Sequence, residues 1–526
     1  MPDADLVLFG EVLTMDAAVP RAAGVAVRGG RVTEVGERAA VAQHVGKATR
    51  VLELGDGVVL PGFHDAHVHL TKHGIALEEI DLSTTVDAHA GLAMVRRRAL
   101  AAPPGTWLTG SGFALQRWGL DTLGPEERAA LDAAAPDNPV LIRSQDHHSA
   151  WVNGAALRAA RIDRHTPDPP NGFLARGADG EPTGFLVERA VELVRACLPT
   201  PGPAALRAAL SAAGDDLAAR GVTTVHHMAF EPPAYWRELA LAASDPGYPL
   251  RVWACVPQAD IEHAAALGVA TGQGGDHFQV GGAKFFADGA LGSRTAWMLE
   301  PYPDGGSGMV VDGPEMLAER FPLAIEAGLA PVTHAIGDAA NRAVLDALER
   351  TARDWRERRL RPRIEHAQHL HPGDVERFAR LGVTASMQPI HLVLDVDSVR
   401  TLLADREERA YPMRSLLDAG VNLAFGSDTP VAQPDVIAGL RAACRRKGPS
   451  GPALTPHQAI GVEEALAAYT VGAARAIGRE GRSGRLAPGC DADLVALTGD
   501  PRGSLDEVAV RATFKAGRQT FGEQIG

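Results

Sequence analysis

The amino-acid sequence predicts an α/β fold: a (β/α)8 TIM barrel with a β-sandwich built from both termini and an insertion after the first barrel strand. Three observations support this prediction. The two ends of the 526-residue chain are rich in strand patterns, whereas its middle alternates apolar strands with helical segments. The gap between the first two barrel strand candidates is also too long for a single helix.

Both ends of the chain predict short strands, which we assign to a composite β-sandwich over residues 1–57 and 482–526. Apolar and β-branched runs alternate there with Gly-Gly or charged turns. The runs are 6–13, 24–27, 31–35 and 50–54 at the start and 493–497, 508–515 and 518–521 at the end. Because the middle of the chain has a different pattern, we expect the two ends to fold together.

Residues 58–70 and 216–481 predict the barrel itself. Eight apolar runs have the length of buried strands, and helical patterns separate most of them. The eight runs are 58–63, 222–227, 250–256, 282–287, 330–334, 363–366, 384–388 and 422–426. Alternating strands and helices in this number are typical of a closed parallel barrel.

The stretch 71–215 predicts an α/β insertion that could act as a lid over the barrel. Residues 107–110 and 139–143 have strand patterns. Aromatic residues and histidines gather in the same stretch, where they could line an apolar pocket or pack the insertion's own core. They are Trp107, Phe113, Trp118, His147, His148 and Trp151.

Composition and charge exclude several kinds of partner. The net charge of −13, without any basic run, argues against a nucleic-acid surface. No apolar run reaches the length of about 20 residues that a membrane helix needs, and the N-terminus shows no secretory signal. The four scattered cysteines fit a reducing cytoplasm. We expect a cytoplasmic protein that acts on a small molecule and could form a homodimer.

Polar residues stand at the carboxyl ends of the predicted barrel strands, where barrels of this kind carry their reactive groups. His67 and His69 are two residues apart, so an extended strand points both to one face. His334, His366 and Asp428 stand at three later strand ends. Imidazoles and carboxylates bind zinc and other divalent metals. The HxH pair alone could be structural, but the five residues together predict a metal site.

Lys284 has an unusual setting. Lysine is rare in this chain, with five among the 52 basic residues. Strand alternation places Lys284 inside the barrel, where an unpaired ammonium group is costly and its pKa falls. It could pair with a buried carboxylate. We favour the alternative, in which the amine reacts with carbon dioxide to form a carbamate whose two oxygens could bridge two metals.

Asp428 is the candidate catalytic residue. One carboxylate oxygen could bind a metal while the other accepts a proton from a metal-bound water, whose pKa falls toward about 7. The structural alternative is a helix N-cap before Thr429-Pro430. Its position at the eighth strand end favours catalysis.

Motifs along nearly the whole chain resemble the amidohydrolase superfamily, in its branch of YtcJ-like hydrolases (amidohydrolase family 3) that includes N-substituted formamide deformylases. The resemblance depends on the order of the motifs, because any one of them could arise by chance. They are PGF at 61–63, GVTTVH at 221–226, ADGALGSRTA at 287–296, HAIGD at 334–338, IEHAQ at 364–368, SMQP at 386–389, FGSDTPV at 425–431 and GCDADL at 489–494.

The resemblance implies a distorted barrel, a composite β-sandwich and a centre of one or two divalent metals, expected to be zinc. The implied ligands are His67, His69 and Asp428 for the more buried metal, His334 and His366 for the second, and carboxylated Lys284 as the bridge. A metal-bridging hydroxide would attack a carbonyl carbon, while Asp428 takes its proton and returns it to the leaving group. The expected reaction is cleavage of a non-peptide C–N bond in an N-substituted amide or formamide.

Three positions depart from the family pattern. His64 stands where the family often has an apolar residue, His227 where an aspartate is expected and His147 where glycine is usual. His64 and His147 could be structural histidines or could line the substrate pocket. The candidates for substrate binding are His148, Trp151, Asp288, Arg294 and Gln388.

Two other functions stay open at this point. One is a deaminase of the same superfamily, which would use one metal and no bridging lysine. The other is a non-catalytic barrel kept for binding or regulation, although every implied ligand position is filled in this chain. The number of bound metals and hydrolysis of an amide and ester panel would distinguish the three.

Overall fold

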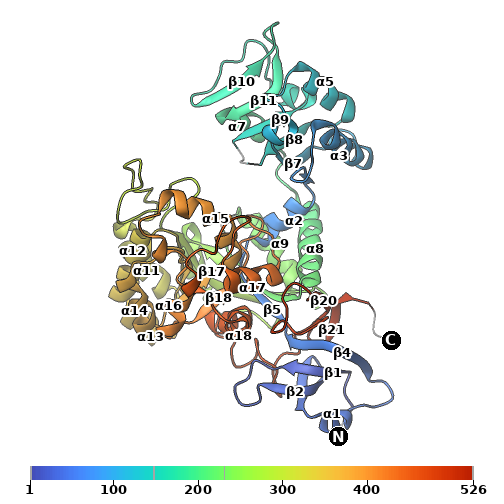
Figure 1. Ribbon diagram of the computed structural model, residues 1–526, viewed down its shortest axis with the longest axis vertical. Helices are drawn as coiled ribbons and strands as arrows, with labels where there is room; N and C mark the ends of the chain where they lie inside the picture. The colour runs from blue at the N-terminus through green and yellow to red at the C-terminus, as the bar shows by residue number, and fades with distance from the viewer. Residues whose placement is uncertain (1–2, 146–147, 230, 524–526) are drawn as a thin grey trace. The chain divides into compact units, whose positions relative to one another are not determined.

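The computed structural model describes residues 3–145, 148–229 and 231–523. The chain divides into two compact units, whose elements are labelled in Figure 1. The first unit comprises Met1–His73 and Leu210–Gly526 and contains the barrel and a sheet formed by both termini. The second unit, Gly74–Ala209, has a sheet of its own.

Eight parallel strands form the barrel, in the order β18-β17-β16-β15-β14-β13-β12-β5. They are β5 (Phe63–Val68), β12 (Val222–His227), β13 (Arg251–Pro257), β14 (Phe278–Phe286), β15 (Pro331–Ala335), β16 (Arg363–His366), β17 (Thr384–Met387) and β18 (Leu423–Phe425). Backbone hydrogen bonds from Asp428 N to His67 O (2.7 Å) and from His69 N to Thr429 O (2.9 Å) join the two ends of this sheet. The predicted barrel is therefore confirmed.

Helices surround the barrel strands (Figure 1). They include α8 (Pro203–Ala219), α9 (Pro233–Ser244), α11 (Pro314–Glu326), α12 (Asp338–Arg350), α14 (Pro372–Leu381), α15 (Pro389–Leu402), α16 (Met413–Asp418) and α17 (Val436–Arg445). In α14, Pro372 occupies the first turn, and Val375, Phe378 and Leu381 recur every three residues on the buried face. Gly382, with φ of +77°, ends the helix in the left-handed conformation that glycine adopts without strain.

The predicted first barrel strand, residues 58–63, needs a correction. Residues 58–61 belong to β4 (Arg50–Pro61), which pairs with β19 (Leu494–Leu497) in the terminal sheet, whereas the barrel strand begins at Phe63. Gly62 separates the two strands, and a Cβ at this position would lie 2.3 Å from the Thr223 side chain. The sequence reads as one apolar run here, so its pattern does not show where the chain changes its pairing partner.

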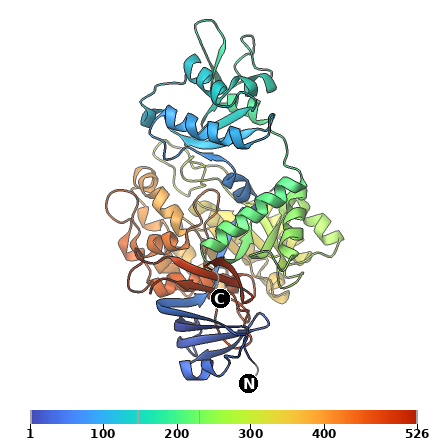
Figure 2. The same ribbon diagram turned by 90° about the vertical axis from the view of Figure 1, so that its right-hand side faces the viewer.

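Both termini contribute to a seven-stranded mixed sheet, in the order β21-β20-β19-β4-β1-β2-β3. Its remaining strands are β1 (Leu6–Leu13), β2 (Arg21–Arg28), β3 (Arg31–Gly36), β20 (Val510–Lys515) and β21 (Arg518–Gly522). Figure 2 shows the blue N-terminal strands beside the red C-terminal ones. Leu8 and Val27 share a hydrophobic cluster with Ala496 and Phe514, so the two ends of the sheet enclose a common core. The predicted composite of both termini is confirmed.

The second unit has a six-stranded mixed sheet in the order β10-β11-β9-β8-β7-β6. Its strands are β6 (Ile80–Asp81), β7 (Leu108–Phe113), β8 (Val140–Ser144), β9 (Ser149–Val152), β10 (Gly172–Arg176) and β11 (Pro182–Glu188). The longest helices are α3 (Ala88–Ala101) and α5 (Pro125–Ala134). Two hydrophobic clusters of its own stabilise the unit. The predicted insertion after the first barrel strand is thus confirmed, while its role as a lid stays a prediction.

Candidate metal centre

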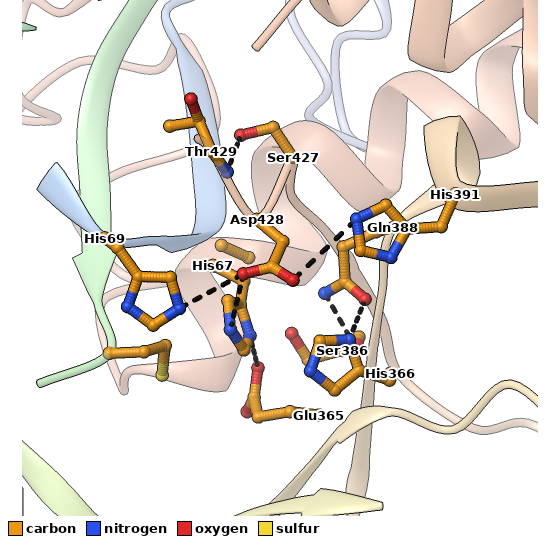
Figure 3. A network of polar contacts seen from close by, with 12 residues as sticks. His67, His69, Glu365, His366, Ser386, Gln388, His391, Ser427, Asp428 and Thr429 are labelled. Atoms are coloured by element: carbon orange, nitrogen blue, oxygen red, sulfur yellow. Dashed lines mark hydrogen bonds and ion pairs between the residues drawn. The ribbon is translucent and has the colours of Figure 1, made fainter. Parts of the chain in front are cut away.

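The carboxyl ends of β5 and β18 bring three predicted metal ligands together. Asp428 Oδ1 lies 3.2 Å from His69 Nε2 and 3.4 Å from His67 Nε2, and all three residues are buried (Figure 3). Their ligand atoms lie within 4.8 Å of one another. Asp65 fixes the loop that carries Asp428, because its carboxylate accepts hydrogen bonds from Ser427 N (2.8 Å) and Ser427 Oγ (2.6 Å).

The chemistry of these three side chains fits a divalent cation. Asp428 Oδ1 is buried and has no hydrogen-bond partner among the described residues, an arrangement that is costly unless a cation satisfies the oxygen. Burial acts to raise the pKa of Asp428, but the electrostatic effect of the surrounding histidines His67, His69 and His366 outweighs burial and holds it well below its ordinary value. Burial lowers the pKa of His67, so this imidazole is neutral, as metal binding requires.

His366 and His391 form a second group with the same carboxylate. Their ligand atoms and those of Asp428 lie within 4.8 Å of one another, and His391 Nε2 is 3.8 Å from Asp428 Oδ2. The two rings stack with centroids 6.1 Å apart (Figure 3). His391 Nε2 is buried and has no hydrogen-bond partner among the described residues. Asp428 therefore faces His67 and His69 with one oxygen and His391 with the other.

Gln388, whose predicted substrate role stays a prediction, holds His366. Its Oε1 lies 2.7 Å from His366 Nδ1. Because an amide oxygen only accepts, Nδ1 carries the proton and Nε2 keeps the lone pair that a metal would use. His366 and Asp428 both have left-handed backbones, with φ of +74° and +62°. Such conformations are strained for residues other than glycine and are concentrated at functional sites.

His334 and Lys284 lie on neighbouring strands of the same barrel. His334 Nε2 is 3.1 Å from Gly289 O, to which it donates, so Nδ1 is the nitrogen left for a cation. Its ring lies 4.4 Å from that of His366, centroid to centroid. Lys284 is buried, donates to Phe285 O (3.1 Å) and lies over the Phe286 ring. Burial lowers the pKa of Lys284 to about 8.

Comparison with known proteins decides the family. Residues 50–521 match the family described as the amidohydrolase family. The chain belongs to the amidohydrolase family. It is 34% identical to Protein LONG AFTER FAR-RED 3 of Arabidopsis thaliana, over 98% of this chain and 91% of that protein. It is 33% identical to YtcJ of Bacillus subtilis, over 94% of each chain.

Two further similarities concern activity and fold. This amidohydrolase is 28% identical to N-substituted formamide deformylase of Arthrobacter pascens, over 97% of each chain. It is 26% identical to an uncharacterized metal-dependent hydrolase of Pyrococcus horikoshii, whose crystal structure matches with a TM-score of 0.78 over 94% of this chain and 98% of that one. The predicted class, a metal-dependent hydrolase of C–N bonds, is confirmed, and the predicted small-molecule substrate agrees with it.

The other predicted substrate-binding residues of this amidohydrolase all have partners within their own unit, and Asp288 also lies 3.5 Å from His334 Nε2. The Asp288 carboxylate accepts hydrogen bonds from the backbone nitrogens of Trp297, Ile336 and Gly337, at 2.8–3.0 Å. Arg294 is exposed and pairs with Asp304. In the second unit, His148 pairs with Glu188, and Trp151 is fully buried in the core. Their substrate roles stay predictions.

The histidines that depart from the family pattern have different settings. His64 is fully buried and contacts His226 and Ser483. His227 Nδ1 accepts from Leu70 N (3.1 Å). His147 lies outside the described residues.

Sequence reasoning missed His391 and the role of Glu365. His391 lies in the first turn of α15, which begins directly after Gln388, and that position next to a strand end was the signal available. Glu365 precedes His366, and its carboxylate contacts His67 Nδ1 at 2.7 Å. Among the described residues, no helix is long and apolar enough to cross a membrane.

Proposed function

We propose that this amidohydrolase cleaves the C–N bond of a small N-substituted amide, with N-substituted formamides as the first class to test. The observation that carries the proposal is the buried Asp428 carboxylate, whose Oδ1 faces His67 and His69 and whose Oδ2 faces His391. The similarity to the deformylase of Arthrobacter pascens supports an amide carbonyl as the reacting group.

In this proposal the barrel holds two zinc ions. The proposed ligands are His67 Nε2, His69 Nε2 and Asp428 Oδ1 for the first, His334 Nδ1 and His366 Nε2 for the second, and carboxylated Lys284 as the bridge. Nitrogen and oxygen donors of this kind suit zinc. When bound, the ions would supply Lewis acidity that polarises the substrate carbonyl and lowers the pKa of a water molecule.

The setting of Lys284 supports the carbamate. The lysine is buried inside the barrel, donates to a backbone carbonyl and makes no ion pair with any carboxylate in the described part of the chain. The alternative, in which Lys284 pairs with a buried carboxylate, therefore has no carboxylate partner among the described residues. Conversion to a carbamate would replace a costly buried cation by an anion between two metals.

Asp428 moves the proton in the proposed mechanism. Its Oδ2 accepts a proton from the attacking water and delivers it to the nitrogen of the leaving amine. Burial lowers the pKa values of His67 and His366, so these rings stay neutral and do not take that proton. Glu365 and Gln388 hold the two rings by their Nδ1 atoms, which keeps the Nε2 lone pairs available for a metal.

The experiment is a hydrolysis assay of zinc-loaded protein with N-substituted formamides, acetamides and amidines, in which the released amine or ammonia is measured. We expect formamide cleavage and a loss of about 100-fold or more in kcat for Asp428→Asn. Near-wild-type turnover in that variant would refute Asp428 as the base. Ammonia release from amidines with one metal per chain would favour the deaminase, and no turnover on any substrate would favour a binding protein.

The expected cellular setting and assembly remain proposals. The four cysteines are free, which supports a reducing cytoplasm. A homodimer stays a prediction that sedimentation can test.

A further inference from the structure

A fully buried carboxylate contacts the proposed metal ligand His67 at Nδ1, the ring nitrogen that does not face Asp428. Glu365 Oε2 lies 2.7 Å from His67 Nδ1, and their side chains are 0% and 2% exposed. A carboxylate only accepts hydrogen bonds, so Nδ1 carries the proton and the Nε2 lone pair faces Asp428 Oδ1 (Figure 3). His67 belongs to β5 and Glu365 to β16, which are not neighbours in the sheet, so the contact crosses the barrel.

Arg363 holds Glu365 in place. Its Nε lies 2.5 Å from Glu365 Oε1 and its Nη2 lies 2.9 Å from Oε2, a bidentate pair on one face of the same strand. Nη2 also donates to Ser386 Oγ (2.6 Å) and to Ala66 O (2.5 Å). Arg363 therefore joins β16 to β17 and to the backbone of β5, one residue before His67.

The remaining nitrogen of Arg363 begins a series of hydrogen bonds through two neutral histidines. Arg363 Nη1 lies 2.8 Å from His226 Nδ1, and because arginine only donates, Nδ1 accepts and His226 Nε2 carries the proton. That proton points to His64 Nδ1 at 3.4 Å, and His64 Nε2 lies 2.9 Å from Ser483 Oγ. Burial lowers the pKa values of both histidines, so both are neutral. His64, which departs from the family pattern, thus gives the buried His226 N–H a hydrogen-bond acceptor.

We propose that Glu365 and Arg363 are positioning residues that fix the tautomer and direction of His67 for metal binding, with His226, His64 and Ser483 holding the guanidinium from the other side. The proposal rests on the proposed metal-dependent function. A fully buried ion pair contributes little net stability compared with apolar residues of similar size. Its retention beside His67 is explained if it holds that metal ligand in the geometry that binds metal. Loss of such a supporting residue typically weakens metal affinity about 10- to 100-fold.

The chain offers a matched control for this proposal. Arg251 and Asp493 form another buried bidentate pair in the first unit, with distances of 2.6 Å and 3.0 Å, and neither residue contacts a proposed metal ligand. Glu365→Gln and Asp493→Asn each remove one charge from a buried pair, so both should destabilise the fold. Only Glu365→Gln should alter His67.

The test measures the zinc dissociation constant of folded full-length protein by competition with a chelator, and the tautomer of His67 by 15N NMR of the metal-free protein. His67→Asn assigns the signal. We expect Glu365→Gln to weaken zinc binding about 10- to 100-fold and to give a mixture of His67 tautomers, while Asp493→Asn keeps wild-type affinity. Wild-type affinity and a single His67 tautomer in Glu365→Gln would overturn the proposal, as would an equal loss of affinity in Asp493→Asn.

A second variant covers the case in which Glu365→Gln does not fold. Glu365→Asp keeps the charge opposite Arg363 but withdraws the carboxylate from His67 by one methylene, so zinc binding should again weaken, by about 10-fold or more. Unchanged affinity in this variant would overturn the proposal. If wild-type protein binds zinc tightly but hydrolyses no amide, the proposed function fails, whereas the positioning role is judged by affinity alone.

Discussion

His391 Nε2 lies 3.8 Å from Asp428 Oδ2, the carboxylate oxygen that does not face His67 and His69. The nitrogen is buried and has no hydrogen-bond partner among the described residues. A histidine in that position can donate to a substrate that reacts beside Asp428, or it can bind a second cation with His366. Metal content separates the two roles.

We expect His391→Asn to lower kcat by about 100-fold while zinc content stays unchanged, because the variant loses a donor beside the reacting atoms. Metal analysis and steady-state kinetics check this. His369→Gln is the control, since His369 is also buried without hydrogen bonds from described residues but belongs to neither ligand group. Loss of one metal in His391→Asn would instead place His391 among the ligands.

Lys284→Met should remove the proposed bridge. We expect zinc content to fall from two ions per chain to at most one and kcat to fall by about 100-fold or more. Reloading of stripped wild-type protein should be faster with bicarbonate, and the variant should show no such dependence. Lys515→Met, at another buried lysine, is the control for loss of a buried ammonium group. Two tightly bound metals in Lys284→Met would contradict the carbamate.

Gly426→Ala tests the closure of the barrel at the site. A Cβ at this position would lie 2.5 Å from His67 N and 2.7 Å from Asp65 Oδ1. Such overpacking costs about 1–3 kcal/mol and should also weaken zinc binding, because it displaces β5. Urea denaturation and metal titration measure both effects. Gly481→Ala, where a Cβ meets no atom within 4 Å, should behave like the wild type.

Stability at alkaline pH should report on Lys515. This lysine is buried in the terminal sheet and donates to Tyr248 O (2.7 Å), and burial lowers its pKa from 10.5 to about 8. Between these two values the unfolded chain binds more protons, so the contribution of Lys515 to the free energy of unfolding rises with pH. The rise is at most about 3 kcal/mol.

Urea denaturation of wild-type protein and Lys515→Met at several pH values from 7.5 to about 10.5 isolates this contribution. The stability of the wild type relative to the variant should increase across that range, because all other groups titrate alike in both. A difference that stays constant with pH would show that Lys515 has an ordinary pKa.

The sequence predicted the barrel well where its signals are local. The strands Val222–His227 and Arg363–His366 have the predicted bounds, and each ends in a histidine. The first strand was misplaced, because residues 58–63 form one apolar run that does not show where the chain changes its pairing partner at Gly62.

The ligand group could be predicted because each member stands at a strand end. His391, Glu365 and Arg363 could not be assigned in the same way. Glu365 and Arg363 contact β5 from β16, and these strands are not neighbours, so the contacts depend on tilt and register rather than on spacing in the sequence. His391 lies in helix α15 rather than at a strand end, so its approach to Asp428 depends on how that helix begins.

The most direct test of the account is anomalous diffraction at the zinc edge from crystals of zinc-loaded protein. The account predicts a metal bound by His67 Nε2, His69 Nε2 and Asp428 Oδ1 at about 2.0–2.2 Å, and a second metal between His334 and His366. Zinc-loaded protein that hydrolyses amides but has no metal bound by His67, His69 and Asp428 would contradict it.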